Sequence, residues 1–291
     1  MSALDAIYRV AAIPSAPTKI LASDYLECGG GMAANASVAV ARLGGQSHYW
    51  GRLGDDPLGT RILAQLAAEG VDTAGVRRIA GCVSPSAAIL VADDGERLVC
   101  AYNDPKLDAD ASWLPLARVA GFSAVLADVR WPAGAAAVLE AARASGIPAV
   151  LDGDIGPADV LRDLAGRATH VAFSEPGLAR VAGVQSPGDG LRRMAARVPG
   201  IVGVTLGADG YLWWDGRQER RLAAPAVRAV DTLAAGDTWH GAFTLALGEG
   251  SGVEAAARFA NVAAALKCTR FGGRLGAPTR AEVEAFSAAH P

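Results

Sequence analysis

The sequence is poor in the residues that mark disulfide-bonded and metal-binding proteins. Among 291 residues there are four histidines, which show no ligand spacing, and four cysteines, which lie far apart and form no CxxC pair. This pattern favours reduced, buried thiols over disulfides or a zinc site. The cysteines are Cys28, Cys82, Cys100 and Cys268.

The chain also lacks a strong excess of charge and a long apolar run. Its 27 basic and 30 acidic residues are scattered and give a net charge of -3. This balance provides no electrostatic footprint for nucleic acid or an anionic membrane. No uncharged run reaches the roughly 18 residues that a membrane span requires, and the N-terminus has no signal-peptide pattern. We therefore expect a cytoplasmic protein whose partners are small molecules, with no nucleic acid and no membrane.

What the chain does contain is apolar residues, at 51% hydrophobic against 20% charged. At this length they can bury one large core, or one core with a small appendage. Residues 6–28 read as two extended segments separated by Pro14 and Pro17, and residues 86–102 read as a hairpin around the turn 93–96. Between them, residues 29–45 read as a glycine turn entering an apolar helix, followed by a strand at 48–54.

From about residue 122, short apolar strands alternate with helices. The strands are expected at 124–129, 149–152, 170–174 and 201–207, and the helices at 133–144, 157–165, 175–182 and 187–198. This alternation predicts an α/β fold with a parallel sheet covered on both faces. Ligands of such sheets bind at the carboxyl ends of the strands. Residues 128–131, 152–154, 174–175 and 205–210 are therefore candidates for the site.

The run DTLAAGDTWHGAF, residues 231–243, carries the most specific chemistry. A glycine-containing turn here enters an apolar helix, so Ala235, Gly236 and Asp237 would offer unpaired first-turn amides to an anion, assisted by the helix dipole. Asp237, in the same turn, would accept a proton from a hydroxyl group. The alternative interpretation is an Asp helix cap that follows a glycine turn.

Three separated runs together resemble the ribokinase-like, PfkB-type carbohydrate kinases. They are GGGMAANASVAVARLG with GRLGDDPLG, then TLGADG at 205–210, then DTLAAGD with its helix. The resemblance covers nearly the whole chain. It implies a Rossmann-like three-layer α/β/α sandwich with a small β-sheet lid, in one domain over 1–291 with lid segments at about 6–28 and 84–104. It also implies transfer of the γ-phosphate of ATP to a sugar hydroxyl group.

The resemblance assigns roles to individual residues. Asp237 would be the general base, and the amides of Ala234, Ala235, Gly236 and Asp237 would form the anion hole. The remaining assignments are Thr205, Gly207 and Gly210 for the nucleotide, and Gly30, Gly31, Asn35 and Asp5 for the sugar. The physical requirements agree, because phosphoryl transfer depends on positioning and charge neutralisation.

The chain departs from the family pattern at three places. Ala234 stands where the family usually has glycine, so the turn must adjust if that position needs a positive φ. Only four residues precede Asp5, so we expect the family's first strand to be missing. Where the family commonly has Asn-x-x-Glu near the metal and phosphates, this chain has Ser174, Glu175, Pro176 and Gly177. Glu175 is then the candidate for organising Mg²⁺ through water, with a helix-start role as the alternative.

Four further runs resemble sulfofructose kinase, a branch of the family that phosphorylates 6-deoxy-6-sulfofructose at its 1-hydroxyl. They are VLADVRW, VLDGDI, VAFSEPGLARVAGV and ALKCTRFGGR. Arg130 follows a strand on the ligand side of the sheet, where its guanidinium would offer a fork to a sulfonate or phosphate. Lys19, between the lid strands, could close on the same group. The alternatives are an ion pair of Arg130 with Asp128 or Asp152, and a solvated Lys19.

Three other features have simpler interpretations. The run 259–273 reads as a helix leading to a glycine turn, and in the family this region borders the adenine and a monovalent-cation loop. Asn261 would then lie beside the base, or be a solvated residue of an ordinary packed helix. His240 reads as a packing or hydrogen-bonded residue, and Trp213 and Trp214 as hairpin aromatics.

The sequence thus predicts an ATP- and Mg²⁺-dependent sugar kinase, with a monovalent cation such as K⁺ as a further candidate cofactor. The predicted substrate is 6-deoxy-6-sulfofructose. The nearest alternative is a kinase of another ketose or its 6-phosphate, and an alternative of another class is a sugar-sensing module without turnover. A homodimer through the lid sheets is the family-level expectation.

Overall fold

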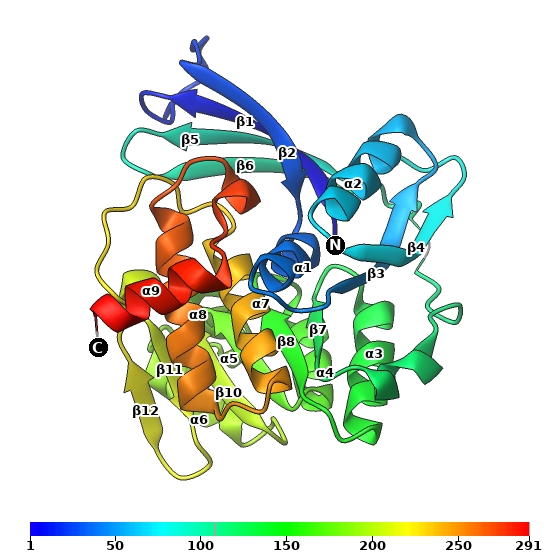
Figure 1. The fold of residues 1–291 in the computed structure, drawn as a ribbon, viewed down its shortest axis with the longest axis vertical. Helices are drawn as coiled ribbons and strands as arrows, with labels where there is room; N and C mark the ends of the chain where they lie inside the picture. Colours follow the sequence, from blue (N-terminus) through cyan, green and yellow to red (C-terminus); the bar gives the residue numbers. More distant parts are fainter. Residues whose placement is uncertain (108, 291) are drawn as a thin grey trace. The chain divides into compact units, whose positions relative to one another are not determined.

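The computed structural model describes residues 1–107 and 109–290, which form two compact units (Figure 1). The first unit comprises residues 1–108, 227–239 and 263–291, and the second comprises 109–226 and 240–262. Helices α7 (Ala235–Gly248) and α8 (Val253–Cys268) each contribute residues to both units.

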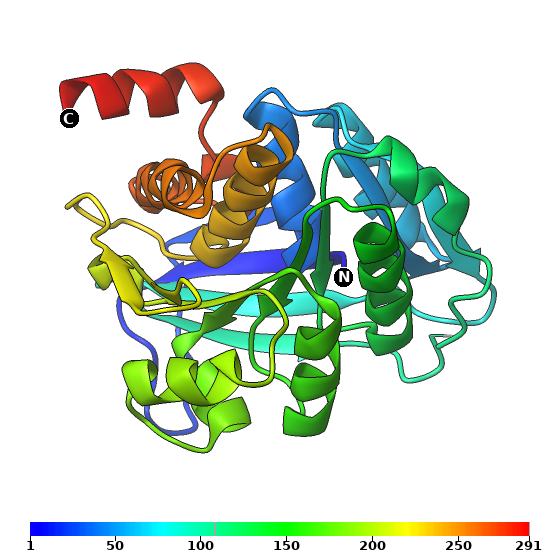
Figure 2. The same cartoon turned by 90° about the horizontal axis from the view of Figure 1, so that it is seen from below.

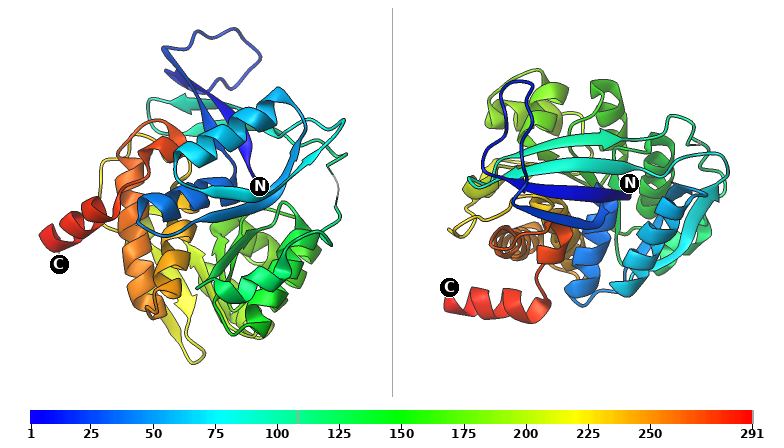
Figure 3. Two further views of the ribbon diagram at one scale, coloured as in Figure 1. Left: turned by 45° about the vertical axis from the view of Figure 1, so that its right-hand side comes forward. Right: turned by 90° about the horizontal axis from the view of Figure 1, so that it is seen from above.

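The first unit contains a four-stranded sheet in the order β2-β1-β5-β6. Its strands are β1 (Ala3–Val10), β2 (Asp24–Gly30), β5 (Ser86–Ala92) and β6 (Arg97–Tyr102). The predicted hairpin at 86–102 is therefore confirmed. The early pair starts and ends elsewhere than predicted, because residues 11–23 form a long connection (Figure 3). Pro14 and Pro17 lie in it, and proline has no amide hydrogen to donate to a strand partner.

The two faces of this sheet differ in exposure. On one face, Ile7, Cys28, Ile89 and Val91 form a buried cluster, against which Leu233 and Phe271 pack. On the other face, Tyr25 pairs with Tyr8, Tyr8 with Leu90, and Leu90 with Leu98. Tyr25, Tyr8 and Leu98 are 53%, 37% and 43% exposed. This apolar row is partly open to solvent.

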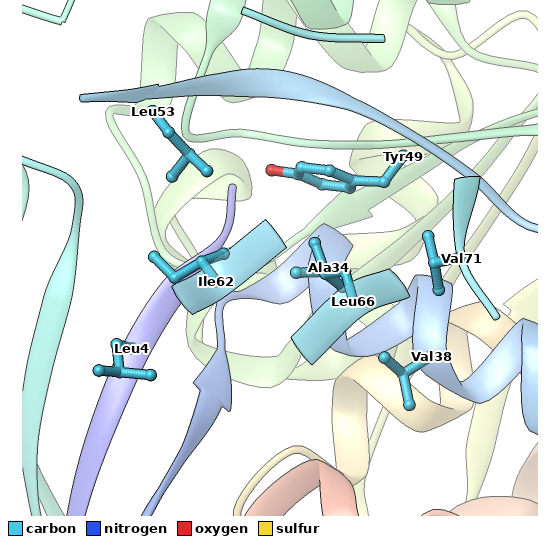
Figure 4. Packing of buried hydrophobic residues seen from close by; sticks show 8 residues of the cluster. All are labelled: Leu4, Ala34, Val38, Tyr49, Leu53, Ile62, Leu66 and Val71. Atoms are coloured by element: carbon cyan, nitrogen blue, oxygen red, sulfur yellow. The ribbon is translucent and has the colours of Figure 1, made fainter. Parts of the chain in front are cut away.

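A second part of the same unit packs two helices against two parallel strands. The elements are α1 (Met32–Arg42), β3 (His48–Gly54), α2 (Pro57–Ala68) and β4 (Asp72–Ile79). Their buried core, with Leu4 from β1, is shown in Figure 4. The helix predicted within 29–45 and the strand at 48–54 are confirmed, whereas α2 and β4 were not predicted. Asp56 caps α2 by accepting a hydrogen bond from the Gly59 amide at 2.7 Å.

The unit ends in α8, a short 3-10 turn (η3, Gly273–Gly276) and α9 (Arg280–Ala289). Helix α9 begins with a capping box, in which the Thr279 hydroxyl accepts from the Glu282 amide and the Glu282 carboxylate accepts from the Thr279 amide.

The second unit contains a six-stranded sheet in the order β12-β11-β10-β9-β8-β7. Strands β7 (Val125–Asp128), β8 (Ala149–Gly153), β9 (His170–Ser174) and β10 (Ile201–Thr205) are parallel, and β11 (Tyr211–Trp214) and β12 (Glu219–Leu222) form an antiparallel edge hairpin. Helices α3 (Pro132–Ala144), α4 (Ala158–Arg167), α5 (Glu175–Ala182) and α6 (Pro187–Ala195) cover one face (Figure 2). The predicted strand–helix alternation is confirmed.

Among the described residues, no helix is long and apolar enough to cross a membrane. The four cysteines are free, as expected from their spacing. They are not uniformly buried, however, because Cys100 is exposed and Cys268 is only partly buried. The prediction of buried thiols thus holds for Cys28 and Cys82 alone.

Candidate active site

Asp237, the predicted base, lies in the first turn of α7 and is partly exposed. Asn35 of α1 donates a hydrogen bond from its Nδ2 to Oδ2 of Asp237 at 2.7 Å. Asn35 is only 5% exposed, and its Oδ1 has no hydrogen-bond partner among the described residues. A residue predicted to bind the sugar therefore contacts the predicted base, and its free carbonyl oxygen can still accept a bond from a ligand hydroxyl.

The turn before α7 holds Ala234 in the left-handed region, at φ 63°. Among the described residues it is the only non-glycine with a positive φ. For an L-residue this conformation costs about 1–2 kcal/mol. Thr238 fixes the turn, because its amide and its hydroxyl both donate to the Ala234 carbonyl, at 3.0 and 2.9 Å. Ala234, which replaces the glycine usual in the family, therefore keeps a positive φ, and its backbone is strained.

The amides at the start of α7 are not all as the sequence predicts. The Ala235 amide donates to the Thr232 carbonyl at 3.2 Å, so it is not one of the unpaired donors expected in the anion hole. Gly236 is exposed, and a Cβ built at this position would meet no atom within 4 Å. The space beside Gly236 is open, and the helix dipole gives it positive potential.

Asp5, on β1, is 6% exposed and lies against Gly30 of β2. A Cβ at Gly30 would come within 1.9 Å of Asp5 Oδ2, so only glycine leaves room for this carboxyl group. Burial raises the pKa of Asp5 to about 6, and the nearby Arg274 guanidinium opposes that rise. Two residues predicted to bind sugar, Asp5 and Gly30, are therefore in direct contact.

Arg274, in η3, is a residue that the sequence reasoning missed. It is 2% exposed and lies against Gly29, where a Cβ would come within 1.9 Å of its Nη2. Its Nη2 donates to Gln65 Oε1 at 3.3 Å, whereas Nε and Nη1 have no partner among the described residues. Burial lowers the pKa of Arg274. The run RFGGR does not by itself mark Arg274 as buried; the usable signal is Gly29, because a glycine in a strand often marks the close approach of another group.

Gly31 and Lys19, also predicted to bind the sugar, lie in different surroundings. Gly31 is the N-cap of α1 at φ 92°, and a Cβ there would come within 2.7 Å of the Met1 carbonyl oxygen. Position 31 thus requires glycine because of its positive φ and the nearby Met1 carbonyl. Lys19 is exposed in the connection between β1 and β2.

Arg130 belongs to the second unit and follows β7. Its amide donates to Asp128 Oδ1 at 2.8 Å, and its Nη2 lies 3.8 Å from Asp154 Oδ2. The alternative interpretation named Asp128 or Asp152 as the ion-pair partner; the observed partner is Asp154. This pair is long, and both side chains are 37% exposed, so the guanidinium keeps donors for an anion.

Trp131, next in the chain, is held in place by several contacts. Its ring stacks on Trp113 with centroids 5.5 Å apart, and its Nε1 donates to the Ala109 carbonyl at 3.1 Å. Gly134 leaves room for the ring, since a Cβ there would come within 2.4 Å of it. With Pro132 opening α3, these contacts restrict the backbone of Arg130.

The predicted nucleotide residues gather around the ends of β10 and β11. Thr205 ends β10, opposite Ser174 of β9, and its hydroxyl donates to the Phe173 carbonyl at 3.3 Å. Gly207 begins the short 3-10 turn η2 (Gly207–Asp209) and Gly210 follows it, with φ of 56° and 88°. A Cβ at Gly210 would come within 2.1 Å of the Leu222 carbonyl oxygen, whereas one at Gly207 would meet nothing within 4 Å.

Asn261, on α8, is 4% exposed, and its Nδ2 donates to the carbonyls of Leu222 and Ala223 at 3.3 and 3.2 Å. It therefore fastens the chain that leaves β12. Neither the prediction of a base neighbour nor the alternative of a solvated residue included this role.

Glu175 is exposed and opens α5 directly after β9. Ser174 caps that helix by accepting from the Gly177 amide at 3.2 Å. Among the described residues no three His, Cys, Asp or Glu side chains gather into a metal site. A single exposed carboxylate fits a Mg²⁺ ion held mostly by water and phosphate oxygens, as this ion prefers.

His240 is 3% exposed, with Nε2 3.1 Å from the Ala172 carbonyl and Nδ1 3.5 Å from Asp152 Oδ2. The prediction of a packed, hydrogen-bonded histidine is confirmed. Burial raises the pKa of Asp152 well above its ordinary value, and the Asp154 carboxylate adds to that rise. Trp213 is buried in β11, as expected of a hairpin aromatic.

Comparison with known sequences identifies the class of protein. Residues 2–280 match the pfkB family of carbohydrate kinases, and the chain belongs to this family. It is 32% identical over 275 residues to the ribokinase of Bacillus subtilis (strain 168), covering 93% of this chain and 92% of that protein. It is 29% identical to the fructokinase of Vibrio alginolyticus, covering 94% of each.

Solved structures agree in fold over nearly the whole chain. A crystal structure of a protein from Agrobacterium tumefaciens matches with a TM-score of 0.96 at 43% identity, covering 99% of this chain and 95% of that chain. Arabidopsis thaliana ribokinase complexed with ribose and ATP matches with a TM-score of 0.82 at 25% identity, covering 98% and 95%. The ribokinase-like α/β fold predicted from the sequence is thus confirmed, and the chain is an ATP-dependent phosphotransferase acting on sugars.

Proposed function

We propose that this kinase phosphorylates 6-deoxy-6-sulfofructose at its 1-hydroxyl group. The Asp237 carboxylate accepts the hydroxyl proton as the sugar oxygen bonds to the γ-phosphorus of ATP and the bond to ADP breaks. Asn35 orients that carboxylate through its 2.7 Å hydrogen bond. Positioned proton transfer of this kind contributes roughly 100 to 10,000-fold in rate.

The start of α7 holds the transferred phosphoryl group. Its dipole and the amides of the 234–237 turn stabilise negative charge, with open space beside Gly236 and with Ala235 engaged within the turn. When bound, Mg²⁺ neutralises charge on the phosphate oxygens. Glu175 is the residue we assign to its water shell.

Asp5 and Asn35 supply hydrogen-bond acceptors for the sugar hydroxyls. Gly30 and Gly31 let the backbone of β2 and α1 approach closely. Thr205, Gly207, Gly210 and Asn261 shape the nucleotide side, where Asn261 acts by holding residues 222–223.

The substrate assignment rests on Arg130, whose side chain is partly exposed. Its guanidinium has a planar fork of donors that suits a three-oxygen anion, and its ion pair with Asp154 is long, at 3.8 Å. Hydrogen bonds to a charged group contribute about 1.5–3 kcal/mol each, so Arg130 would favour an anionic hexulose about 10 to 100-fold. Lys19 is the second cation that we assign to this group.

Geometry alone does not separate sulfonate from phosphate, since both present three oxygens. The preference for sulfonate comes from the resemblance of the runs around Arg130, Glu175 and Lys267 to sulfofructose kinase. The relatives named ribokinase and fructokinase favour a second candidate, a kinase of a neutral ketose or pentose.

An ADP-release assay with sulfofructose, fructose 6-phosphate, fructose, tagatose and ribose tests the proposal. We expect kcat/KM for sulfofructose to exceed that for the others at least 10-fold. Arg130→Met should raise KM for the anionic sugar 10 to 100-fold and leave a neutral ketose unchanged, whereas Arg130→Lys should lose less. Arg217→Met, on the exposed β11–β12 turn, is the matched control. Equal loss on anionic and neutral sugars would make Arg130 structural.

A further inference from the structure

Lys267, on the last turn of α8, is a buried cation beside the catalytic loop. Its side chain is 0% exposed. Its Nζ donates to the Asp231 carbonyl oxygen at 2.6 Å and lies 3.2 Å from Asp231 Oδ2. A lysine is almost never fully buried unless it is paired. Here Asp231 alone supplies both oxygens that contact the ammonium, one from its backbone and one from its side chain.

Asp231 is likewise 0% exposed, and its carboxylate has a full set of donors. The Leu233 amide donates to Oδ1 at 2.8 Å, and the amides of Gly272 and Gly273 donate to Oδ2 at 3.0 Å each. The two glycines have φ of 107° and 57°, values that side chains disfavour. The turn after α8 is therefore shaped so that its amides point at this carboxylate.

The end of α8 is also bonded to residues 230 and 231. The Cys268 carbonyl accepts from the amides of Val230 and Asp231, at 2.7 and 3.1 Å. A helix C-terminus carries negative potential, which stabilises a cation in its last turn. Burial lowers the pKa of Lys267, and the Asp231 carboxylate opposes that fall.

The family resemblance implies that this region borders a monovalent-cation loop. An alkali cation is held by several carbonyl or carboxylate oxygens that replace its water. Here, the Lys267 ammonium already contacts the Asp231 carbonyl oxygen and its carboxylate Oδ2. The amides of Leu233, Gly272 and Gly273 also donate hydrogen bonds to that carboxylate. A second cation at these oxygens would be repelled by the ammonium. The residues present do not fit an alkali cation.

We propose that the Lys267 ammonium replaces the monovalent cation in this chain, so that the enzyme needs no K⁺. Lys267 is a positioning residue. It neutralises Asp231, and the Asp231 carboxylate fixes the Leu233 amide immediately before Ala234 and the first turn of α7. From the other side, the Thr232 hydroxyl donates to the Gly95 carbonyl of the β5–β6 turn at 3.4 Å. The Lys267 ammonium thus stabilises residues 231–234, the segment that leads into α7 and positions Asp237.

The first test uses the wild-type enzyme in KCl, NaCl and tetramethylammonium chloride at equal ionic strength. We expect kcat to agree within twofold in the three salts. The melting temperature, measured without sugar or ATP, should agree as well, and this readout is independent of which sugar is the substrate. A rise in kcat of fivefold or more with K⁺, or a K⁺-specific rise in melting temperature, would overturn the proposal.

The second test uses Lys267→Ala, which opens a space beside the Asp231 oxygens. We expect kcat to fall at least 10-fold in tetramethylammonium chloride, and K⁺ or NH₄⁺ to restore part of both kcat and melting temperature. Lys106→Ala, at an exposed position, is the matched control and should show neither effect. If Lys267→Ala keeps the wild-type rate and melting temperature in tetramethylammonium chloride, Lys267 is not the substitute. If the variant does not fold, the wild-type salt series still decides.

Discussion

Asn35 and Asp237 lie 202 residues apart in the chain, and their side chains are joined by a 2.7 Å hydrogen bond. The donor is on α1 and the acceptor on α7, so the bond couples the glycine turn at 29–31 to the turn at 234–237. Asn35 is buried and Asp237 is partly exposed. Asn35 thus orients the Asp237 carboxylate, and the partly exposed Asp237 side chain can be reached by a ligand.

We expect Asn35→Ala to lower kcat about 10 to 100-fold, because a hydrogen bond to a charged group contributes about 1.5–3 kcal/mol. Nucleotide affinity, measured by titration calorimetry, should stay within threefold of wild type. Asn103→Ala, at an exposed position, serves as the control. A variant whose kcat stays within twofold of wild type would remove Asn35 from the positioning of Asp237.

Asp5 should make stability depend on pH. Its pKa is raised from 3.8 to about 6 by burial, so the folded state binds its proton more tightly than the unfolded state. Its contribution to stability is full below about pH 4 and is lost as the pH rises through 6, by about 3 kcal/mol in total.

Urea unfolding of Asp5→Asn and wild type at pH 4 and pH 7 measures this contribution. The difference in unfolding free energy should move in favour of the variant by about 2 kcal/mol between pH 4 and pH 7, because at pH 4 part of the contribution is already lost. If the two proteins keep the same difference at both pH values, the Asp5 carboxyl group does not titrate as its burial implies.

Ala234→Gly should not lose stability, although alanine-to-glycine changes in helices cost about 1 kcal/mol. The reason is that Ala234 has φ 63°, which glycine adopts without strain. Ala64→Gly, at an exposed position inside α2, is the control that should show the ordinary loss. A loss for Ala234→Gly as large as that of the control, by thermal or urea unfolding, would show that the turn stores no strain.

The exposed row of Tyr25, Tyr8 and Leu98 gives the expected lid dimer a specific test. An apolar row on one face of a sheet is a surface that a second copy would cover. We expect light scattering to give the mass of two chains for the wild-type protein and the mass of one chain for Leu98→Glu. Val83→Glu, an exposed position outside the sheet, is the control and should keep the mass of two chains. A wild-type protein with the mass of one chain would contradict the dimer.

Local patterns predicted much of the fold. Strands β3 and β9 and helix α5 lie where the sequence placed them, because an apolar run between polar turn residues specifies a buried element. Strand β1 was misplaced because its neighbours β2 and β5 are distant in sequence and determine where pairing starts. Helix α2 was missed although Asp56 and Pro57 are ordinary signals of a helix start.

The site was predictable in its residue types but not in its contacts. Asp237 and Asn35 were both named from motifs, yet nothing in their spacing joins them. Lys267 was not recognised because a lysine near a helix end is usually solvated, and only the fold shows that Asp231 meets it in the interior. The partner of Arg130 was also unpredictable, since Asp128, Asp152 and Asp154 all lie at the carboxyl ends of the neighbouring strands β7 and β8, and only the geometry selects Asp154.

The central claim is that Asp237 takes the proton of the attacking sugar hydroxyl. The most direct measurement is the rate of ADP release by Asp237→Asn with the best sugar of the panel, together with its affinity for ATP. We predict that turnover falls at least 100-fold while ATP binds within threefold of wild type. Turnover within tenfold of wild type would contradict the claim.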